Sequence, residues 1–412
     1  MPSCHRSAEN EKTGNPPGCN SHFANTCEMP PARVSEANEP MRIFVTQSLL
    51  VSLVLLGCGS GSSSNHTGTT GGSSNGAQGG ASSVTGGTTN GGSAGTSTND
   101  ASTGIDCALP AAGSAGVAKP LGVPGNLKVL NWAGYKGAVT YTFDDANSSQ
   151  LTNYAALNAL GVHMTFYLIT SNIDSTNRSS WAQVLADGHE LGNHTVTHPQ
   201  TGTAPEVDGA TNTIKNTFGV RPWTMAAPYG DTSYVALAQT RFLINRGVNN
   251  ALILPNDSSN PFNLPCYIPP QAGTAAANFN PQIDSAETGG GWRVLLVHGF
   301  TGGTDSAYQP VSIDEFVAGV NHAKDLGDLW IDSMVDVGAY WRGQKTFSGI
   351  TPTTSGDNTT WTWTLPDNFP PGKCLRVTVD GGTLTQAGTA LDWDSHGYYE
   401  ISLDAGSLTL SP

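Results

Sequence analysis

Two adjacent carboxylates, Asp144 and Asp145, end an apolar run that begins near residue 138. If a strand delivers them to the mouth of a folded domain, two acids in different surroundings can do two different chemical jobs. The residues that follow, Ala-Asn-Ser-Ser, leave a simpler alternative, because Asp, Asn and Ser are favoured N-cap residues of helices. The pair alone therefore indicates either a reactive site or a helix cap.

Two histidines four residues apart, His194 and His198, are the next chemical signal. On a helical turn this spacing places both imidazoles on one face, which suits a metal bound by two neutral nitrogen donors. A carboxylate from elsewhere would complete a three-ligand site with an open position for water, as in catalytic metal centres. Two unrelated polar histidines would show the same spacing.

The elements that must position these residues are strand-like and helix-like runs that alternate from about residue 126. The predicted strands are 138–143, 164–169, 190–194, 223–226, 242–248, 293–298 and 329–332, and the predicted helices are 148–160, 181–186, 205–218, 233–241 and 313–326. This alternation predicts a parallel sheet with crossover helices. About seven such units favour a distorted (β/α) barrel, with its site at the C-terminal ends of the strands.

From about residue 346 the pattern changes to short runs with a period of two residues and no helices, at 359–364, 374–379 and 398–403. Such alternation between turn residues predicts a small all-β sandwich over 346–412. Its aromatic residues form either a sugar-stacking platform for glycan binding or one half-buried core face; they are Trp361, Trp363, Tyr398 and Tyr399.

Four motifs together have the order and approximate spacing found in the NodB-homology polysaccharide deacetylases, carbohydrate esterase family 4. They are Thr-Phe-Asp-Asp at 142–145, His-x3-His at 194–198, Ala-Pro-Tyr-Gly at 227–230 and Leu-Leu-Val-His at 295–298. The chain resembles that family over about residues 131–340, so we expect the catalytic domain to occupy 105–345. One motif of the family, usually Asp-x-x-Asp-Trp, has no clear counterpart here.

The resemblance implies a role for six residues and a divalent metal cofactor. Asp145, His194 and His198 would bind the metal, Asp144 would be the general base, His298 the general acid, and the backbone N–H of Tyr229 would stabilise the oxyanion. Two imidazoles and one carboxylate favour zinc, while cobalt, nickel or iron would fit the same ligands.

The chain departs from the family at Ala226, where many members have an arginine that pairs with the catalytic aspartate. Without a cation the pKa and the orientation of Asp144 would be less well fixed. Arg246, at the end of the next predicted strand, is the candidate replacement, because that strand delivers its end to the same face of the barrel. The alternatives are that activity is lost or that Arg246 lies on the surface or pairs with another acid.

The expected function is metal-dependent hydrolysis of acetyl groups on a polysaccharide, with N-acetyl groups favoured. O-deacetylation of xylan, hydrolysis of a cyclic imide or related amide, and glycan binding without catalysis are the alternatives. The net charge of −14 argues against nucleic acid as a partner, because phosphate binding requires a basic patch.

Residues 41–58 have one positive charge, a short apolar core and a small residue before Cys58. This length suits a secretory signal and is too short to span a bilayer comfortably. The end of the segment resembles the lipobox of bacterial lipoproteins, which implies a lipid on Cys58 and an exported domain anchored to the cell envelope; an ordinary secretory signal or a buried helix is the alternative. We expect Met41 to be the true start, so that 1–58 combine a non-native extension with a signal peptide.

Residues 59–104 are almost wholly Gly, Ser, Thr, Asn and Ala, a composition that predicts a flexible linker. Such a coil has an r.m.s. reach of roughly 35–40 Å. Export also means an oxidising compartment, in which one pair among Cys107, Cys266 and Cys374 can form a disulfide. The sequence does not say which pair.

Overall fold

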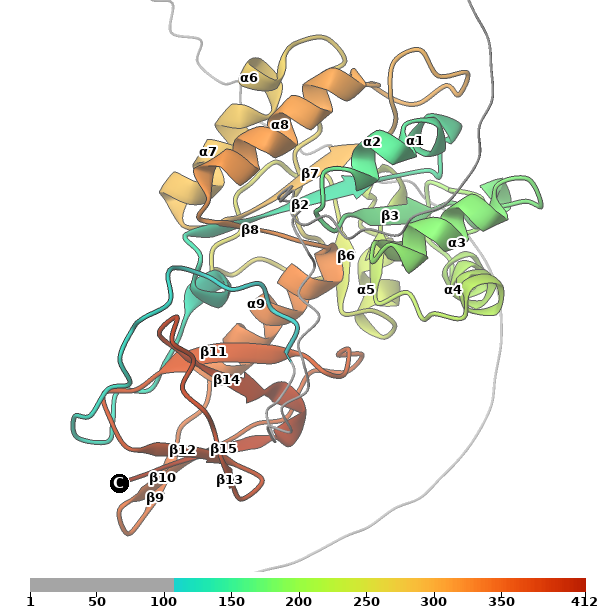
Figure 1. Cartoon of the computed structure of the whole chain (residues 1–412). Helices are drawn as coiled ribbons and strands as arrows, with labels where there is room; N and C mark the ends of the chain where they lie inside the picture. The colour runs from blue at the N-terminus through green and yellow to red at the C-terminus, as the bar shows by residue number, and fades with distance from the viewer. Residues whose placement is uncertain (1–106) are drawn as a thin grey trace, which may run out of the picture. The chain divides into compact units, whose positions relative to one another are not determined.

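The computed structural model describes residues 107–412, and its barrel is built around β2 (Gly137–Phe143), whose seven residues are all buried (Figure 1). Burial on both faces is typical of parallel strands and explains the continuous apolar run. One edge of β2 pairs in parallel with β7 (Trp292–Val297). The other edge is shared, since β3 (Thr165–Leu168) pairs near its C-terminal end and β8 (Leu329–Ile331) pairs near its N-terminal end.

Three further parallel strands extend the sheet beyond β3 in the order β4 (Glu190–Asn193), β5 (Thr224–Ala226) and β6 (Ile244–Arg246). The gap between β6 and β7 is closed by residues 264–267, which make one parallel bridge to each of these two strands. The predicted barrel is therefore confirmed. It is distorted because this short segment takes the place of a full strand.

The predicted helices are all present in the structure. They are α3 (Arg178–Ala186), α4 (Ala204–Phe218), α5 (Tyr234–Gln239), α8 (Ile313–Leu326) and, in place of one helix at 148–160, the two short helices α1 (Ser148–Thr152) and α2 (Tyr154–Asn158). Asn153 separates α1 from α2. Helix α8 has a side-chain N-cap, because Ser312 Oγ accepts a hydrogen bond from the N–H of Glu315.

Three helices were missed, namely α6 (Ala275–Asn278), α7 (Asn280–Gly289) and α9 (Met334–Ser348). The first two lie between the predicted strands 242–248 and 293–298, where no element was predicted, and α7 buries only Ile283 and Ala286, too few residues for a visible period. Helix α9 was missed because too many of its residues are buried. Nine of its residues are buried and they surround the helix, so no polar face reveals the helical period.

The C-terminal region forms two antiparallel sheets, as the sequence predicted, and the first of them also includes a short strand that precedes the barrel. The first has the order β1-β11-β14, with β1 (Lys128–Val129), β11 (Cys374–Thr378) and β14 (Tyr399–Ser402). The second has the order β13-β12-β15-β10-β9, with β9 (Thr353–Ser355), β10 (Asn358–Thr362), β12 (Thr383–Gln386), β13 (Thr389–Ala390) and β15 (Ser407–Ser411). Both sheets contribute to one hydrophobic cluster, which makes them a small sandwich.

The aromatic residues of this sandwich belong to its interior. Trp363, Tyr398 and Tyr399 are each less than 10% exposed, and Trp361 is half-buried against the same hydrophobic cluster. Of the two alternatives offered by the sequence, the structure agrees with a core face, because three buried rings cannot form an exposed platform.

Helix α9 lies between the barrel and the sandwich and packs closely against both (Figure 1). A Cβ atom at Gly338 would lie 2.1 Å from Ile244 Cδ1 of the barrel, and one at Gly343 would lie 2.6 Å from Leu403 Cδ1 of the sandwich. These two glycines therefore allow the helix to approach both neighbours. The predicted boundary between 345 and 346 falls inside α9, and the division into domains stays a prediction.

Cys107 and Cys374 form a disulfide bond, while Cys266 is a buried free thiol. The bond joins the segment before the barrel to the first residue of β11. The predicted signal peptide, lipid site and linker lie outside the described residues. Within 107–412, no helix combines the length and the apolar character required to cross a bilayer.

We predict that replacing both Cys107 and Cys374 with serine lowers the free energy of unfolding by about 2–4 kcal/mol, because the bond restricts an unfolded chain over a separation of 267 residues. Urea unfolding of the oxidised wild type and the double variant measures this difference. Reductant should destabilise the wild type and leave the variant unchanged. Equal unfolding free energies for the two oxidised proteins would contradict the prediction.

Candidate metal centre and active site

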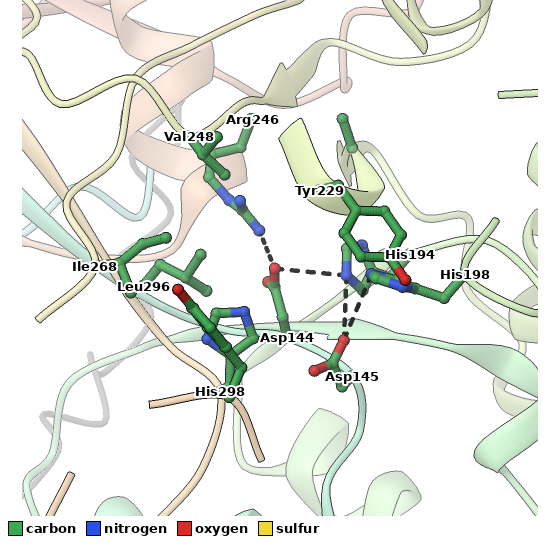
Figure 2. A pocket seen from close by; sticks show the side chains of 12 residues that line it. Asp144, Asp145, His194, His198, Tyr229, Arg246, Val248, Ile268, Leu296 and His298 are labelled. Atoms are coloured by element: carbon green, nitrogen blue, oxygen red, sulfur yellow. Dashed lines mark hydrogen bonds and ion pairs between the residues drawn. The ribbon is translucent and has the colours of Figure 1, made fainter. Parts of the chain in front are cut away.

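All seven residues that the sequence singled out for chemistry line one cavity of about 440 Å³ (Figure 2). They are Asp144, Asp145, His194, His198, Tyr229, Arg246 and His298. Each lies at or just beyond the C-terminal end of a barrel strand. The parallel arrangement of the strands brings these ends to one face, which is why residues far apart in the sequence meet there.

Asp145, His194 and His198 form a cluster whose potential ligand atoms all lie within 4.8 Å of one another. Asp145 Oδ1 is 3.4 Å from His194 Nε2 and 3.8 Å from His198 Nε2. One carboxylate and two imidazoles are a donor set that suits a divalent transition metal with open positions for water. The donor set therefore fits the predicted metal.

The expectation that a helical turn presents the two histidines is wrong. His194 directly follows β4, and the residues up to His198 form bends without helix. Thr195 and His198 have positive φ angles of 67° and 61°, which turn the chain sharply enough to bring the two rings together. Their ring centroids lie 4.7 Å apart.

A hydrogen bond fixes the ring of His194. Its Nδ1 lies 2.9 Å from the carbonyl oxygen of Ala226. Since a carbonyl oxygen can only accept, Nδ1 must carry the proton, which leaves the Nε2 lone pair facing Asp145. Burial and the neighbouring His194 lower the pKa of His198 below its usual value, so that this ring is neutral at pH 7 and able to bind a metal.

Glu206, in the first turn of α4, holds the loop between the histidines. One of its carboxylate oxygens accepts the N–H groups of Val196 and Thr197 at 3.0 and 2.8 Å, and Thr195 Oγ1 accepts the N–H of His198 at 3.0 Å. The sequence signal for this contact is a glutamate in the first turn of the helix that follows the two histidines.

The helix-cap alternative for the two aspartates is wrong, because the N-cap of α1 is Asn147 and the N–H of Ser149 donates to Asp305. Asp145 instead adopts a positive φ of 75° and its carbonyl oxygen accepts a hydrogen bond from Asn172. Burial raises the pKa of Asp145, yet the hydrogen bond and charges of the nearby histidines outweigh it and lower this pKa to about 2. Its carboxylate is therefore ionised at neutral pH.

Asp144 pairs with Arg246, as the sequence hypothesis required. Arg246 Nη2 contacts Asp144 Oδ2, and the two residues are 0% and 2% exposed. Arg246 is the register partner of Ala226 on the neighbouring strand. The guanidinium thus reaches the aspartate from the strand beside the one that carries arginine in the family pattern.

The second oxygen of Asp144, Oδ1, is buried and has no hydrogen-bond partner within the described residues, and the same is true of His298 Nδ1. These two groups are free to exchange protons with a substrate or a water molecule. Gln150 holds the ends of both strands, because its Nε2 donates to the carbonyl oxygens of Asp144 and His298 at 2.6 and 2.8 Å. The sequence offered no signal for this role of Gln150.

Apart from the seven residues named above, the cavity is lined by aliphatic and aromatic side chains. Val248, Ile268 and Leu296 line the wall next to Arg246 and His298 (Figure 2). Two tyrosine rings are exposed at the rim, Tyr229 at 64% and Tyr308 at 58%. Their ring centroids lie 4.6 Å from that of His198 and 5.3 Å from that of His298, respectively.

Trp292, which begins the neighbouring strand β7, is fully buried and donates its indole N–H to Thr140. It therefore belongs to the core. The backbone N–H of Tyr229 donates to no group in the described part of the chain, and the residue has a positive φ of 55° within η3 (Pro228–Gly230). The N–H is available to an anionic oxygen.

Comparison with known proteins adds two sequence findings. Residues 133–245 match the model of a family described as polysaccharide deacetylase. The chain is also 33% identical over 118 residues to a gellan lyase from a Bacillus species, a match that covers 26% of this chain and 5% of the lyase. The chain thus spans a small part of that relative's length. Arg246 and His298 lie beyond the end of the family match.

Solved structures with a similar fold include a family 4 carbohydrate esterase from Streptomyces lividans in complex with acetate, with 21% identity, a TM-score of 0.35 and coverage of 50% of this chain and 95% of that one. A peptidoglycan deacetylase from Bacillus subtilis has 18% identity, a TM-score of 0.34 and coverage of 50% and 91%. Similarity at this level carries no argument about activity or substrate.

We predict that His194→Ala abolishes the retention of a divalent metal, because the remaining pair of ligands cannot hold the ion against dialysis. Metal content after dialysis, measured by inductively coupled plasma mass spectrometry, tests this. His322→Ala is the matched control, since His322 Nε2 lies 2.6 Å from Asp284 on the surface of the barrel and outside the cavity. Equal metal content in His194→Ala and the wild type would refute the assignment.

Proposed function

We propose that this chain is a divalent-metal-dependent deacetylase of polysaccharides. The observation that supports it most directly is the composition of the cavity. It combines the Asp145–His194–His198 cluster with Asp144, which is paired with Arg246, and with a third histidine, His298. The match of residues 133–245 to the polysaccharide deacetylase family supports the same activity.

The metal ligands would be Asp145, His194 and His198, with zinc as the favoured ion. A divalent ion bound there supplies Lewis-acid polarisation of an acyl carbonyl and lowers the pKa of water towards about 7. The ionised carboxylate of Asp145 and the fixed ring of His194 keep these ligands ready for the ion.

Asp144 is proposed as the general base. Its Oδ2 is occupied by Arg246, so the free Oδ1 is the atom that takes the proton of the attacking water. His298 is proposed as the general acid that protonates the leaving amine or alkoxide, because it stands at the end of β7 across the cavity from the metal ligands. The free N–H of Tyr229 would stabilise the developing oxyanion.

N-acetylated polysaccharide is the first choice of substrate, and acetylated xylan the second. The ring of Tyr308 is exposed beside His298 and would contact the sugar that receives the proton. We also propose that the protein is exported and anchored through a lipid on Cys58, so that it acts on a glycan of the cell envelope or the surroundings.

We predict metal-dependent release of acetate when residues 41–412, or the chain from residue 105 onward joined to a cleavable tag, are incubated with N-acetylated chitooligomers, peptidoglycan or acetylxylan. Enzymatic acetate assays with and without a chelator, followed by addition of zinc or cobalt, measure the activity. Acetate from one substrate identifies the bond that is hydrolysed. Glycan binding without acetate under every metal would overturn the proposal and favour a non-catalytic binding protein.

We predict that Arg246→Ala lowers kcat by about 100-fold or more and changes its pH profile, because Asp144 loses its partner cation and its fixed orientation. Metal content and circular dichroism should be compared with the wild type, since removal of one partner of a buried pair also destabilises the fold.

The register of β5 and β6 offers a rescue experiment. In the double variant Ala226→Arg/Arg246→Ala the guanidinium moves to the neighbouring strand position, and we expect most of the lost kcat to return. If Arg246→Ala retained wild-type turnover at every pH, Arg246 would have no positioning role.

A further inference from the structure

A second cavity, of about 350 Å³, lies between the barrel, α9 and the C-terminal sandwich, and none of the seven catalytic candidates lines it. We call it the α9 groove. It is lined by Leu127, Lys128, Val129, Asn131, Asn256, Gln344, Phe347, Ser348, Ile350 and Trp361. Its volume is within the range of small-ligand sites. None of these residues is a carboxylate, although the whole chain is strongly acidic.

The polar side chains that line the α9 groove are three amides, the hydroxyl of Ser348 and the exposed Lys128. Gln344 is 3% exposed, its Nε2 donates to Asn131 Oδ1 at 2.6 Å, and its Oε1 has no hydrogen-bond partner in the described part of the protein. If the amide atoms were exchanged, one atom of Gln344 would still be unpaired. A buried amide atom without a partner is unfavourable, so a ligand group that bonds to it gains affinity.

The apolar part of the groove includes one aromatic ring with a free donor. Trp361 on β10 is half-buried against the hydrophobic core, and its indole N–H makes no hydrogen bond among the described residues. Asn256 lies exposed in the loop after β6, and its amide likewise makes no hydrogen bond within residues 107–412.

We propose that the α9 groove binds an uncharged sugar unit of a polysaccharide. A pyranose ring has apolar C–H faces that pack on an aromatic ring, and hydroxyl groups that both donate and accept, which is the combination that Trp361 and the amides of Asn131, Asn256 and Gln344 match. The choice of a polysaccharide as ligand rests on the proposed function. The composition of the groove does not depend on it.

The groove is separate from the catalytic cavity. Asn131 precedes the N-terminal end of β2, whereas Asp144 follows its C-terminal end, and a strand of seven residues is roughly 20 Å long. A sugar in the groove therefore does not take part in the reaction. Its effect is to retain a long chain near the enzyme, which raises the local concentration of polymer and leaves a small substrate unaffected.

The test uses glycan binding without catalysis. With a chelator present, the wild type should bind a hexamer of N-acetylglucosamine or soluble acetylxylan, measured by affinity electrophoresis and titration calorimetry. We expect Trp361→Ala to weaken binding at least 10-fold, Trp361→Phe to retain most of it, and the exposed-site variant Asn256→Ala to weaken it 3-fold or more. Turnover of a small acetyl ester should be the same in all of these proteins.

Trp393→Ala is the matched control. Trp393 is also a partly buried tryptophan of the sandwich, but it donates to Val117 and lies outside the groove. Unchanged glycan binding in both Trp361→Ala and Asn256→Ala would overturn the proposal, as would an equal loss in Trp393→Ala. Loss of binding in the two groove variants alone supports the groove even if no acetate is released, and in that outcome only the proposed catalytic function fails.

Discussion

The buried ion pair between Asp144 and Arg246 is the interaction on which the catalytic cavity depends. A carboxylate that is 2% exposed is strongly unfavourable without a partner, and a guanidinium that is fully buried is equally so. Burial lowers the pKa of Arg246, but the charge of Asp144 outweighs this and raises it above its usual value, so the arginine stays charged. The pair joins the ends of β2 and β6. Because Arg246 contacts Oδ2 of Asp144, the orientation of the carboxylate is fixed and Oδ1 is left without a hydrogen-bond partner among the described residues.

The surroundings of Arg246 show that it is built into the barrel. Its Nη1 donates to the carbonyl oxygen of Gly247 at 3.1 Å and lies 3.9 Å from Cys266 Sγ, and its guanidinium carbon lies 5.5 Å from the centre of the Tyr167 ring. Cys266 belongs to the segment that closes the barrel between β6 and β7. The segment that closes the barrel therefore also contacts the guanidinium of Arg246.

The proposed metal ligands lie on segments with unusual backbone conformations. Asp145, Thr195, His198 and Tyr229 all have φ angles between 55° and 75°, a region that residues other than glycine rarely adopt. Local patterns in the sequence cannot reveal such conformations. The alternation of strands and helices could therefore be predicted, together with the residues that meet in the cavity, whereas the turn that brings His194 and His198 together could not.

The predicted fold was accurate where the apolar pattern is clear, as in the continuous runs of β2 and β7 and the helical period of α8, whose limits agree with that pattern. It failed for α9, because a helix buried on all sides has no contrast between faces. The position of Arg246 could be inferred because neighbouring parallel strands deliver their ends to one face. Gln150 could not, since a polar residue in a short exposed-looking helix has no distinguishing feature until its two carbonyl partners are known.

The disulfide between Cys107 and Cys374 has a mechanical consequence. Any pull on the chain from its N-terminal side reaches the described fold at Cys107, and the covalent bond transmits that force directly to β11. The segment from residue 108 to β1 is then bypassed and does not bear the load. Because β11 is the middle strand of its sheet, paired with β1 on one side and β14 on the other, the force is spread over two ladders of hydrogen bonds.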